Sequence, residues 1–322
     1  MLECPQIIGG SGFIGTSISQ QYLKRDKEFL VIDKNHPPKK EYDFLKVDIT
    51  DKANFIKERN KGPIINLAAE HRDDVTPADL YYSTNVDGAK NVCEYASLNN
   101  CNKIIFTSSV AVYGLENTNI SELSPTKPFN DYGKSKLAAE KIYIDWQNEK
   151  PEERTVVIVR PTVVFGEGNR GNVYNLFNFI MSGRFMMIGN GKNIKSIAYV
   201  ENISKFILSC LEERPGLFIY NYVDKPDMNM TELVGLVNSL KKNEGKIRNI
   251  PYKLAFAIGK IFDLLAYILP SKPVISSIRI RKFCANSQFN TAIDENKFKR
   301  DYSLDEAIKR TIRYDFKNKC VN

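Results

Sequence analysis

Tyr132 and Lys136 are the two residues of this chain whose types and spacing most clearly indicate proton chemistry. Side chains four positions apart on a helix share a face, so a Lys ammonium can stabilise the phenolate of such a Tyr. Ser109, 23 residues before Tyr132, could then share the proton of a substrate hydroxyl. These groups suit the removal and return of a hydride at a carbinol carbon. Tyr42 and Lys46 have the same spacing, and we interpret that pair as a coincidence.

A glycine-rich loop near the N-terminus predicts a site for a dinucleotide. Gln6–Ile8 reads as a short apolar strand, and Gly9, Gly12 and Gly15 follow it at the spacing that lets a backbone approach a pyrophosphate. A second apolar run ends at Asp33, 18 residues past Gly15. A carboxylate there would accept hydrogen bonds from the adenosine ribose and repel a 2′-phosphate. NAD is therefore favoured over NADP.

Composition and length indicate a large cytoplasmic protein with reduced thiols. The chain has 322 residues, 43% of them hydrophobic, and can bury a large core. Its first residues show no basic flank, apolar run and cleavage site, so we expect a cytoplasmic location. The six Cys form no CxxC pair. His36 and His71 have no metal-ligand spacing, and we expect no metal site.

The positive charge of the chain is concentrated in its last quarter. The net charge is +8, and residues 241–322 hold 18 Lys and Arg against 8 Asp and Glu, a net charge of +10. We expect no nucleic acid as a partner, because no interleaving of aromatic and basic residues accompanies this charge. A solvated helical face, a phosphate-rich substrate and an anionic membrane surface all remain open.

Apolar runs that alternate with helical periodicity predict an α/β fold. The expected strands are Gln6–Ile8, Phe29–Asp33, Phe44–Val47, Pro63–Leu67, Lys103–Ser108 and Thr155–Arg160, and the expected helices are Phe13–Lys24, Lys52–Arg59, Ala78–Leu98, Tyr132–Gln147 and Leu304–Phe316. This order predicts a Rossmann-type, doubly wound parallel sheet over residues 1–160 and a smaller substrate lobe over residues 161–322. Segments such as 197–222 are expected to return to the sheet. Ligands of such sheets bind at the carboxyl ends of the strands, where Asp33, Asp48 and Ser109 fall.

The segment 252–269 has apolar residues around most of a helix. Lys253, Lys260 and Asp263 interrupt it, so it is a poor candidate for a membrane span. Two interpretations stay open: a buried helix of the smaller lobe, and a helix that lies in the membrane interface.

Taken together, the motifs resemble those of the extended short-chain dehydrogenases/reductases. They are the three glycines, Asp33, Asn66-Leu67-Ala68-Ala69, Thr107-Ser108-Ser109 with Tyr113-Gly114, and Tyr132-Gly133-Lys134-Ser135-Lys136, in that order along the chain. The resemblance implies that Tyr132 is the acid and base, that Lys136 holds the nicotinamide ribose, and that Ser109 binds the reacting oxygen. It implies that NAD contacts Gly9, Gly12, Phe13, Ile14, Gly15, Asp33, Asp48, Ile49, Ala68, Asn85, Tyr132, Lys136 and Pro161.

The residues after Ser109 narrow the reaction. Sugar 4,6-dehydratases of this family have Asp-Glu directly after the hydroxyl residue, and this chain has Val110-Ala111, which cannot transfer protons. An epimerase, which keeps NAD bound and returns the hydride to the other face of the sugar, is therefore expected.

Longer runs, among them residues 68–75, 160–176 and 220–227, are similar to epimerases that act at C4 of N-acetylglucosamine carried on undecaprenyl diphosphate. This resemblance implies interconversion with N-acetylgalactosamine through a transient 4-keto sugar, in O-antigen biosynthesis, at the cytoplasmic face of the inner membrane. The alternative is a soluble 4-epimerase of UDP-hexose or UDP-N-acetylhexosamine, or a related keto-sugar oxidoreductase. A homodimer is also expected.

Four polar residues in these runs are candidates for substrate contacts. Glu70 and His71 follow a strand end, and Arg170 and Asn172 could bind a diphosphate or an acetamido group. Ordinary solvated loop structure is the competing explanation for all four.

Overall fold

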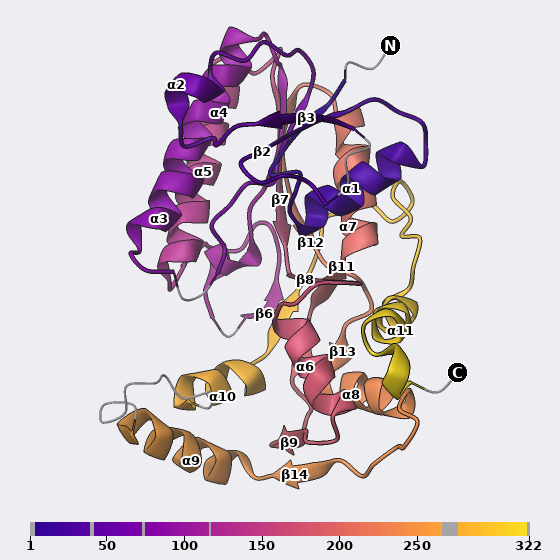
Figure 1. The fold of residues 1–322 in the computed structure, drawn as a ribbon. Coiled ribbons are helices and arrows are strands. Elements are labelled where there is room, and N and C mark those ends of the chain that lie inside the picture. The colour runs from indigo at the N-terminus through magenta and orange to yellow at the C-terminus, as the bar shows by residue number, and fades with distance from the viewer. Residues whose placement is uncertain (1–3, 39–41, 73–74, 116, 266–275, 321–322) are drawn as a thin grey trace.

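The computed structural model describes residues 4–38, 42–72, 75–115, 117–265 and 276–320. A large sheet with helices on both faces forms the upper part of the molecule, and a smaller lobe lies below it (Figure 1). The N-terminus lies at the large sheet and the C-terminus at the smaller lobe.

The large sheet has seven strands, all parallel, in the order β12-β7-β5-β4-β1-β2-β3. Its strands are β1 (Gln6–Ile8), β2 (Leu30–Asp33), β3 (Asp43–Lys46), β4 (Ile64–Asn66), β5 (Lys103–Thr107), β7 (Thr155–Pro161) and β12 (Gly216–Tyr222). Strands covered on both faces read as continuous apolar runs, as in Val156–Val159, where all four residues are fully buried. The predicted Rossmann-type parallel sheet is confirmed.

Helices cover the two faces of this sheet (Figure 1). One face packs against α1 (Phe13–Leu23) and α7 (Val200–Ser209), and the other against α4 (Gly88–Leu98) and α5 (Asp131–Asn148). The expected helix Lys52–Arg59 is shorter, since α2 spans Lys52–Phe55. The expected helix Ala78–Leu98 is interrupted, since a π-helical turn, Ser83–Asp87, separates α3 (Asp79–Tyr82) from α4.

The smaller lobe is built from short strands and amphipathic helices. Its elements are β6 (Asn117–Ile120), β8 (Val163–Phe165), α6 (Asn172–Met181), β9 (Met186–Ile188), β10 (Ile194–Lys195), β11 (Ile197–Tyr199), β13 (Met228–Asn229), α8 (Met230–Ser239), β14 (Arg248–Ile250), α9 (Tyr252–Leu265), α10 (Ser277–Cys284), β15 (Ser287–Phe289) and α11 (Leu304–Asp315). Its core joins α6, α8 and α11 through Phe177, Val237 and Ile308, each fully buried.

Helix α9 stands out from this lobe beside α10 (Figure 1). Ala255 and Gly259 are its buried residues, whereas Leu254, Ile261 and Leu264 are each more than half exposed. The interpretation of this segment as a buried helix is therefore wrong for the part that the structure describes, because most of the large apolar side chains of that part are exposed. Residues 266–269 of the segment lie outside the described residues.

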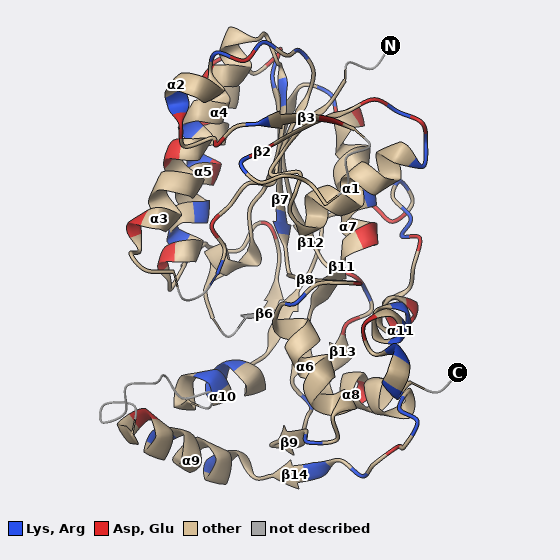
Figure 2. Ribbon diagram, in the orientation of Figure 1, with Lys and Arg blue, Asp and Glu red and all other residues tan. Residues whose placement is uncertain are grey.

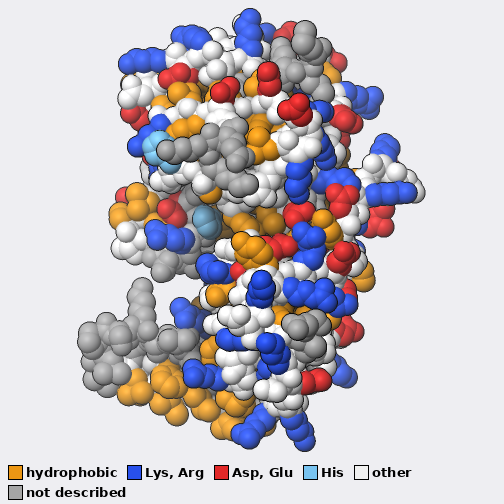
Figure 3. Space-filling model, turned by 45° about the vertical axis from the view of Figure 1, so that its right-hand side comes forward, with side chains coloured by type: hydrophobic (Ala, Val, Ile, Leu, Met, Phe, Trp, Pro, Cys, Tyr) orange, Lys and Arg blue, Asp and Glu red, His pale blue; other side chains and the backbone are white. Residues whose placement is uncertain are grey.

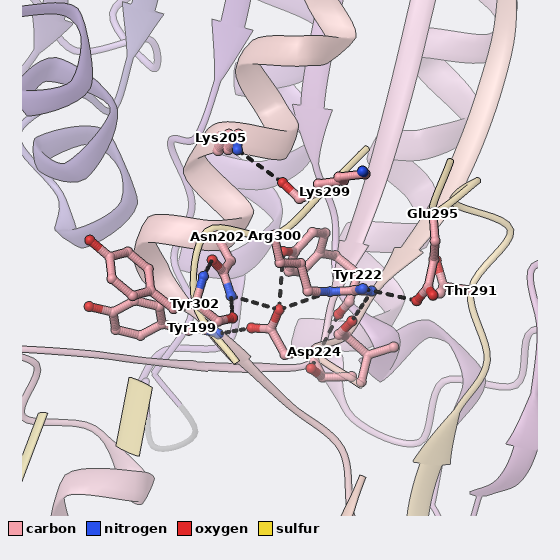
Figure 4. A network of polar contacts seen from close by, with 12 residues as sticks. Tyr199, Asn202, Lys205, Tyr222, Asp224, Thr291, Glu295, Lys299, Arg300 and Tyr302 are labelled. Atoms are coloured by element: carbon pink, nitrogen blue, oxygen red, sulfur yellow. Dashed lines mark hydrogen bonds and ion pairs between the residues drawn. The ribbon is translucent and has the colours of Figure 1, made fainter. Parts of the chain in front are cut away.

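A buried carboxylate ties the two parts of the chain together (Figure 4). Asp224, just past β12, accepts hydrogen bonds from the backbone N–H of Tyr199 (2.5 Å) and the amide of Asn202 (3.0 Å), and forms an ion pair with Arg300 (3.1 Å). Burial raises the pKa of Asp224 to about 6, although these partners oppose the shift. The carboxylate thereby joins the start of α7, the end of β12 and the segment before α11.

We predict that Asp224→Ala lowers the free energy of unfolding by roughly 3–5 kcal/mol, because it leaves Arg300 buried without this partner. Urea denaturation followed by circular dichroism measures the change. Glu295→Ala is the matched control: it removes another partner of Arg300 (3.0 Å) whose side chain is 66% exposed, and should cost less than ~1 kcal/mol. Equal costs for the two variants would contradict a structural role for the buried carboxylate.

Candidate active site

Ser109 and Tyr132 lie on two adjacent elements at the carboxyl end of the sheet. Ser109 follows β5 and begins a 3₁₀ turn, Val110–Tyr113, where its Oγ accepts a hydrogen bond from the backbone N–H of Ala111 (3.1 Å). Tyr132 lies in the first turn of α5, which Asn130 caps by accepting a hydrogen bond from the N–H of Gly133 (2.9 Å).

Gly133 allows the 3₁₀ turn and α5 to approach each other closely. A Cβ atom at this position would lie 2.6 Å from the carbonyl oxygen of Ala111, nearer than any side chain can come. The glycine next to Tyr132 therefore sets the distance between the helix that bears the phenol and the turn that bears the hydroxyl. This role of Gly133 was not expected from the sequence.

Lys136 is a buried cation on the same face of α5 as Tyr132. Its side chain donates a hydrogen bond to the carbonyl of Thr107 (2.7 Å), and its Nζ lies 4.6 Å from the ring centroid of Phe106. Burial lowers the pKa of the Lys136 ammonium to about 7, while the carboxylate of Glu140 acts in the opposite direction. An ammonium with few other partners is well placed to stabilise a phenolate one turn away.

Glu140 and Arg160 form a buried ion pair next to Lys136, which was not expected from the sequence. Glu140 lies one turn after Lys136 and accepts hydrogen bonds from Arg160 of β7 at both of its oxygens (2.9 and 2.6 Å). Ser108 donates to the same carboxylate, and Arg160 also donates to the hydroxyl of Tyr113 (2.6 Å). The available signal was the spacing of Glu140 four residues after Lys136 on one helix face.

Asn85 links the loop after β4 to α5. Its amide oxygen accepts a hydrogen bond from the backbone N–H of Glu70 (2.9 Å), and its amide nitrogen donates to the carbonyl of Glu70 (3.1 Å) and the hydroxyl of Ser135 (2.9 Å). Asn85 lies in the π-helical turn, a distortion that is frequent at functional sites.

The glycine loop brings β1 and β4 together. Gly9 has φ of +74°, and a Cβ atom there would lie 2.6 Å from the backbone nitrogen of Ala68. A Cβ atom at Gly15 would lie 2.5 Å from the backbone of Gly10, so α1 can start directly under the loop. Gly12 precedes Phe13 as the N-cap of α1 and provides no side-chain cap to its first N–H groups.

Asp33 is the last residue of β2, and Asp48 follows the end of the neighbouring strand β3. Asp33 accepts hydrogen bonds from the backbone N–H groups of Ser11 (3.0 Å) and Asn35 (2.9 Å), so it also fixes the loop. Asp48 accepts two hydrogen bonds from Thr50 (both 2.9 Å). Ile49 and Pro161 are buried. Phe13 and Ile14 are partly buried and pack against the hydrophobic core of the smaller lobe.

The four candidate substrate residues do not form one cluster. Glu70 accepts from the backbone N–H of His71 (3.2 Å), whose side chain is exposed beside the loop after β4. Arg170 forms an ion pair with Asp315 of α11 (2.8 Å), and Asn172 is the exposed first residue of α6. The ion pair gives Arg170 a structural partner, and the expected substrate contacts stay predictions.

Comparison with known proteins identifies the family. A model of the NAD dependent epimerase/dehydratase family matches residues 6–221. The chain belongs to this family. It is 43% identical to the N-acetyl-alpha-D-glucosaminyl-diphospho-ditrans,octacis-undecaprenol 4-epimerase of Escherichia coli O157:H7, over 96% of this chain and 94% of the relative.

Several proteins of known structure share the fold of this chain. UDP-N-acetylglucosamine 4-epimerase from Bacillus cereus has a TM-score of 0.75 at 15% identity and covers 97% of this chain and 99% of its own. UDP-glucuronic acid 4-epimerase from the same organism, in complex with NAD, has a TM-score of 0.74 at 16% identity, with 98% and 99% covered. The expected fold and the expected cofactor, NAD, are confirmed.

The residues present fit NAD. Gly9 and Gly15 leave no room for a side chain, so the loop keeps the tight form that brings backbone N–H groups towards a pyrophosphate. No side chain caps the first turn of α1, and the carboxylate of Asp33 ends β2 next to this loop. We propose that these residues hold the adenosine and pyrophosphate, and that Lys136 and Tyr132 face the nicotinamide half.

We predict that Lys136→Met changes how stability depends on pH. The fold lowers the pKa of Lys136 from 10.5 to about 7, so between these values the unfolded chain holds a proton that the folded chain has lost. Wild-type stability, measured against the variant, should therefore rise by about 2 kcal/mol between pH 7 and pH 9. Urea unfolding of both nucleotide-free proteins at the two pH values tests this. A constant difference would show that the amine is not desolvated in the fold.

Proposed function

We propose that this protein is a 4-epimerase that interconverts N-acetylglucosamine and N-acetylgalactosamine on undecaprenyl diphosphate. The observation that carries the proposal is the 43% identity to an enzyme named for this reaction, which extends over 96% of the chain and so includes the smaller lobe. The neighbours with solved structures are below 20% identical and support the fold alone.

Tyr132, Lys136 and Ser109 have separate roles in this reaction. Tyr132 takes the proton of the C4 hydroxyl as the 4-keto sugar forms and returns it when the new hydroxyl is made. Lys136 stabilises the phenolate form of Tyr132 before this proton is taken and after it is returned, and Ser109 donates a hydrogen bond to the reacting oxygen. NAD, when bound, supplies the acceptor and donor of the hydride. Because the hydride returns to the same sugar, no external nicotinamide is consumed.

We predict that Tyr132→Phe reduces turnover by ~10²–10⁴-fold while the fold and NAD binding remain, since only the proton-transferring oxygen is lost. Epimerisation assays and NAD content of the purified protein measure the two effects. Tyr42→Phe is the control: Tyr42 precedes strand β3, which contains Lys46, so the two do not share a helix face. Comparable losses in the two variants would refute the assignment of Tyr132.

The carrier is tested directly with two substrates. Purified protein is incubated separately with N-acetylglucosaminyl-diphospho-undecaprenol and with UDP-N-acetylglucosamine, and the products are separated by chromatography. We expect conversion of the lipid-linked sugar without NADH accumulation. Conversion of the UDP-sugar alone would instead establish the alternative, a soluble nucleotide-sugar epimerase.

A lipid-linked substrate requires access to a membrane, and we further propose that α9 provides it. Leu254, Ile258, Ile261 and Leu265 recur at helical spacing and form an exposed apolar stripe, visible as the hydrophobic band at the lower left edge of Figure 3. The adjoining α10 contains Arg279, Arg281 and Lys282, and its ribbon is coloured blue at such residues in Figure 2. In the described part of the chain, no helix is long and apolar enough to cross a membrane. The expected cytoplasmic location and homodimer stay predictions.

We predict that the protein floats with liposomes that contain anionic lipids and is released by salt, because each Lys or Arg near such a surface contributes up to ~1 kcal/mol and salt screens it. Ile261→Glu should reduce flotation strongly, since Ile261 is 58% exposed in the middle of the stripe. Phe179→Glu is the control, because Phe179 is similarly exposed but lies on α6. Equal flotation of wild type and Ile261→Glu would exclude α9 as the contact.

A further inference from the structure

A cavity of about 520 Å³ lies at the base of the α9–α10 hairpin. Its walls come from the turn after β9, the start of α9 and the end of α10, including Gly189, Asn190, Tyr252, Arg281 and Asn286. Both helices of the hairpin reach the cavity at the same end, because α9 begins there and α10 ends there. The exposed apolar stripe of α9 thus starts beside a polar cavity.

The chemistry of the cavity wall suits an anion. Among the described residues that line it, Arg281 is basic and none is acidic, and three are Asn, of which Asn193 donates its amide N–H to the carbonyl of Phe283 (2.9 Å). Lys195, partly buried behind the wall, donates a hydrogen bond to the carbonyl of Lys282 (2.9 Å) and lies close enough to Cys284 to interact with it. A diphosphate, with its many acceptor oxygens, matches this set of donors.

A row of side chains on α9 leads away from the cavity. Tyr252 lines the cavity, and its ring stacks on that of Phe256 one turn later, with centroids 5.8 Å apart. The ammonium of Lys260, a further turn along, lies 5.7 Å from the centroid of Phe256. Two stacked rings next to an anion site offer an apolar surface of the size that a short isoprenoid segment can cover.

The cavity is connected to the candidate catalytic turn through a small sheet. Thr118 of β6 lines the cavity, and β6 pairs with β15, which follows Asn286. Phe289 of β15 packs against Tyr113 of the catalytic 3₁₀ turn, with ring centroids 6.0 Å apart. A substrate anchored in the cavity by its diphosphate would therefore be held by elements that contact the turn bearing Ser109.

We propose that this cavity holds the diphosphate of the sugar carrier and that Tyr252 and Phe256 bind its first isoprene units, so that the hairpin selects a polyprenyl carrier over a nucleotide. The inference rests on the proposed function and adds the residues that read the carrier. Carrier binding in the cavity and membrane docking by the outer stripe of α9 are separate proposals. The first can be measured with short, soluble diphosphates in the absence of a membrane.

Isothermal titration of the NAD-loaded protein with geranyl diphosphate, inorganic pyrophosphate and UDP, without detergent or lipid, tests the proposal. Geranyl diphosphate should bind at least tenfold more tightly than pyrophosphate and more tightly than UDP. Tyr252→Ala and Phe256→Ala should reduce the affinity for geranyl diphosphate towards that for pyrophosphate, and Phe256→Ala, whose ring is not part of the cavity wall, should leave pyrophosphate binding unchanged. Arg281→Gln should weaken both ligands.

Phe179→Ala is the control, since it removes an exposed ring outside the cavity wall and should alter nothing. Tyr252 is itself 40% exposed, so its variant should fold even if Phe256→Ala does not. Equal affinities for geranyl diphosphate and pyrophosphate, or tighter binding of UDP, would overturn the proposal. If geranyl diphosphate binds as expected but no lipid-linked sugar is epimerised, the proposed function fails and the carrier subsite stands.

Discussion

The buried ammonium of Lys136 is the constraint on which the rest of the candidate site depends. A cation removed from water costs several kcal/mol unless polar groups surround it. Here the groups are the carbonyl of Thr107, the ring of Phe106 and the nearby carboxylate of Glu140. Two of them belong to β5 and one to α5, so the cation is accommodated only when helix and strand are in register. The same register sets Ser109, two residues past Thr107, against the first turn of α5.

The carboxylate that offsets this cation is itself buried, and the ion pair that neutralises it ties a second strand, β7, to the site. Arg160 of β7 binds both oxygens of Glu140 and reaches on to the hydroxyl of Tyr113. Charge-assisted hydrogen bonds of this kind are stronger and more directional than neutral ones. They hold the 3₁₀ turn from beneath while Gly133 fixes it from the side of α5. The position of Ser109 is thus determined by contacts that do not include Ser109.

Local signals in the sequence predicted the parallel sheet, the glycine loop and the order of the motifs, because buried strands and tight turns restrict residue types position by position. NAD followed from the glycine loop and Asp33, the family followed from the resemblance of the whole motif set, and both were confirmed. The pair Glu140–Arg160 could not be predicted, since its members come from different elements and only tertiary packing shows that both are buried. The exposure of α9 could not be predicted from the sequence either. The sequence pattern of an apolar helix is the same whether its apolar residues pack against protein or against lipid.

The packing of α9 against α10 explains why the apolar face of α9 is exposed in the part of the chain that the structure describes. A Cβ atom at Gly259 would lie 2.9 Å from the backbone of Ser277, so the backbones of the two helices approach each other closely at this point. Asp263 accepts a hydrogen bond from the hydroxyl of the same serine (2.5 Å). The helices are therefore held together by a close contact at Gly259, which includes the buried side chain of Ile280, and by the hydrogen bond between Asp263 and Ser277. Leu254, Ile261 and Leu264 add nothing to this packing and expose surface that water solvates poorly, a cost of roughly 25 cal/mol per Å² that burial against a lipid would remove.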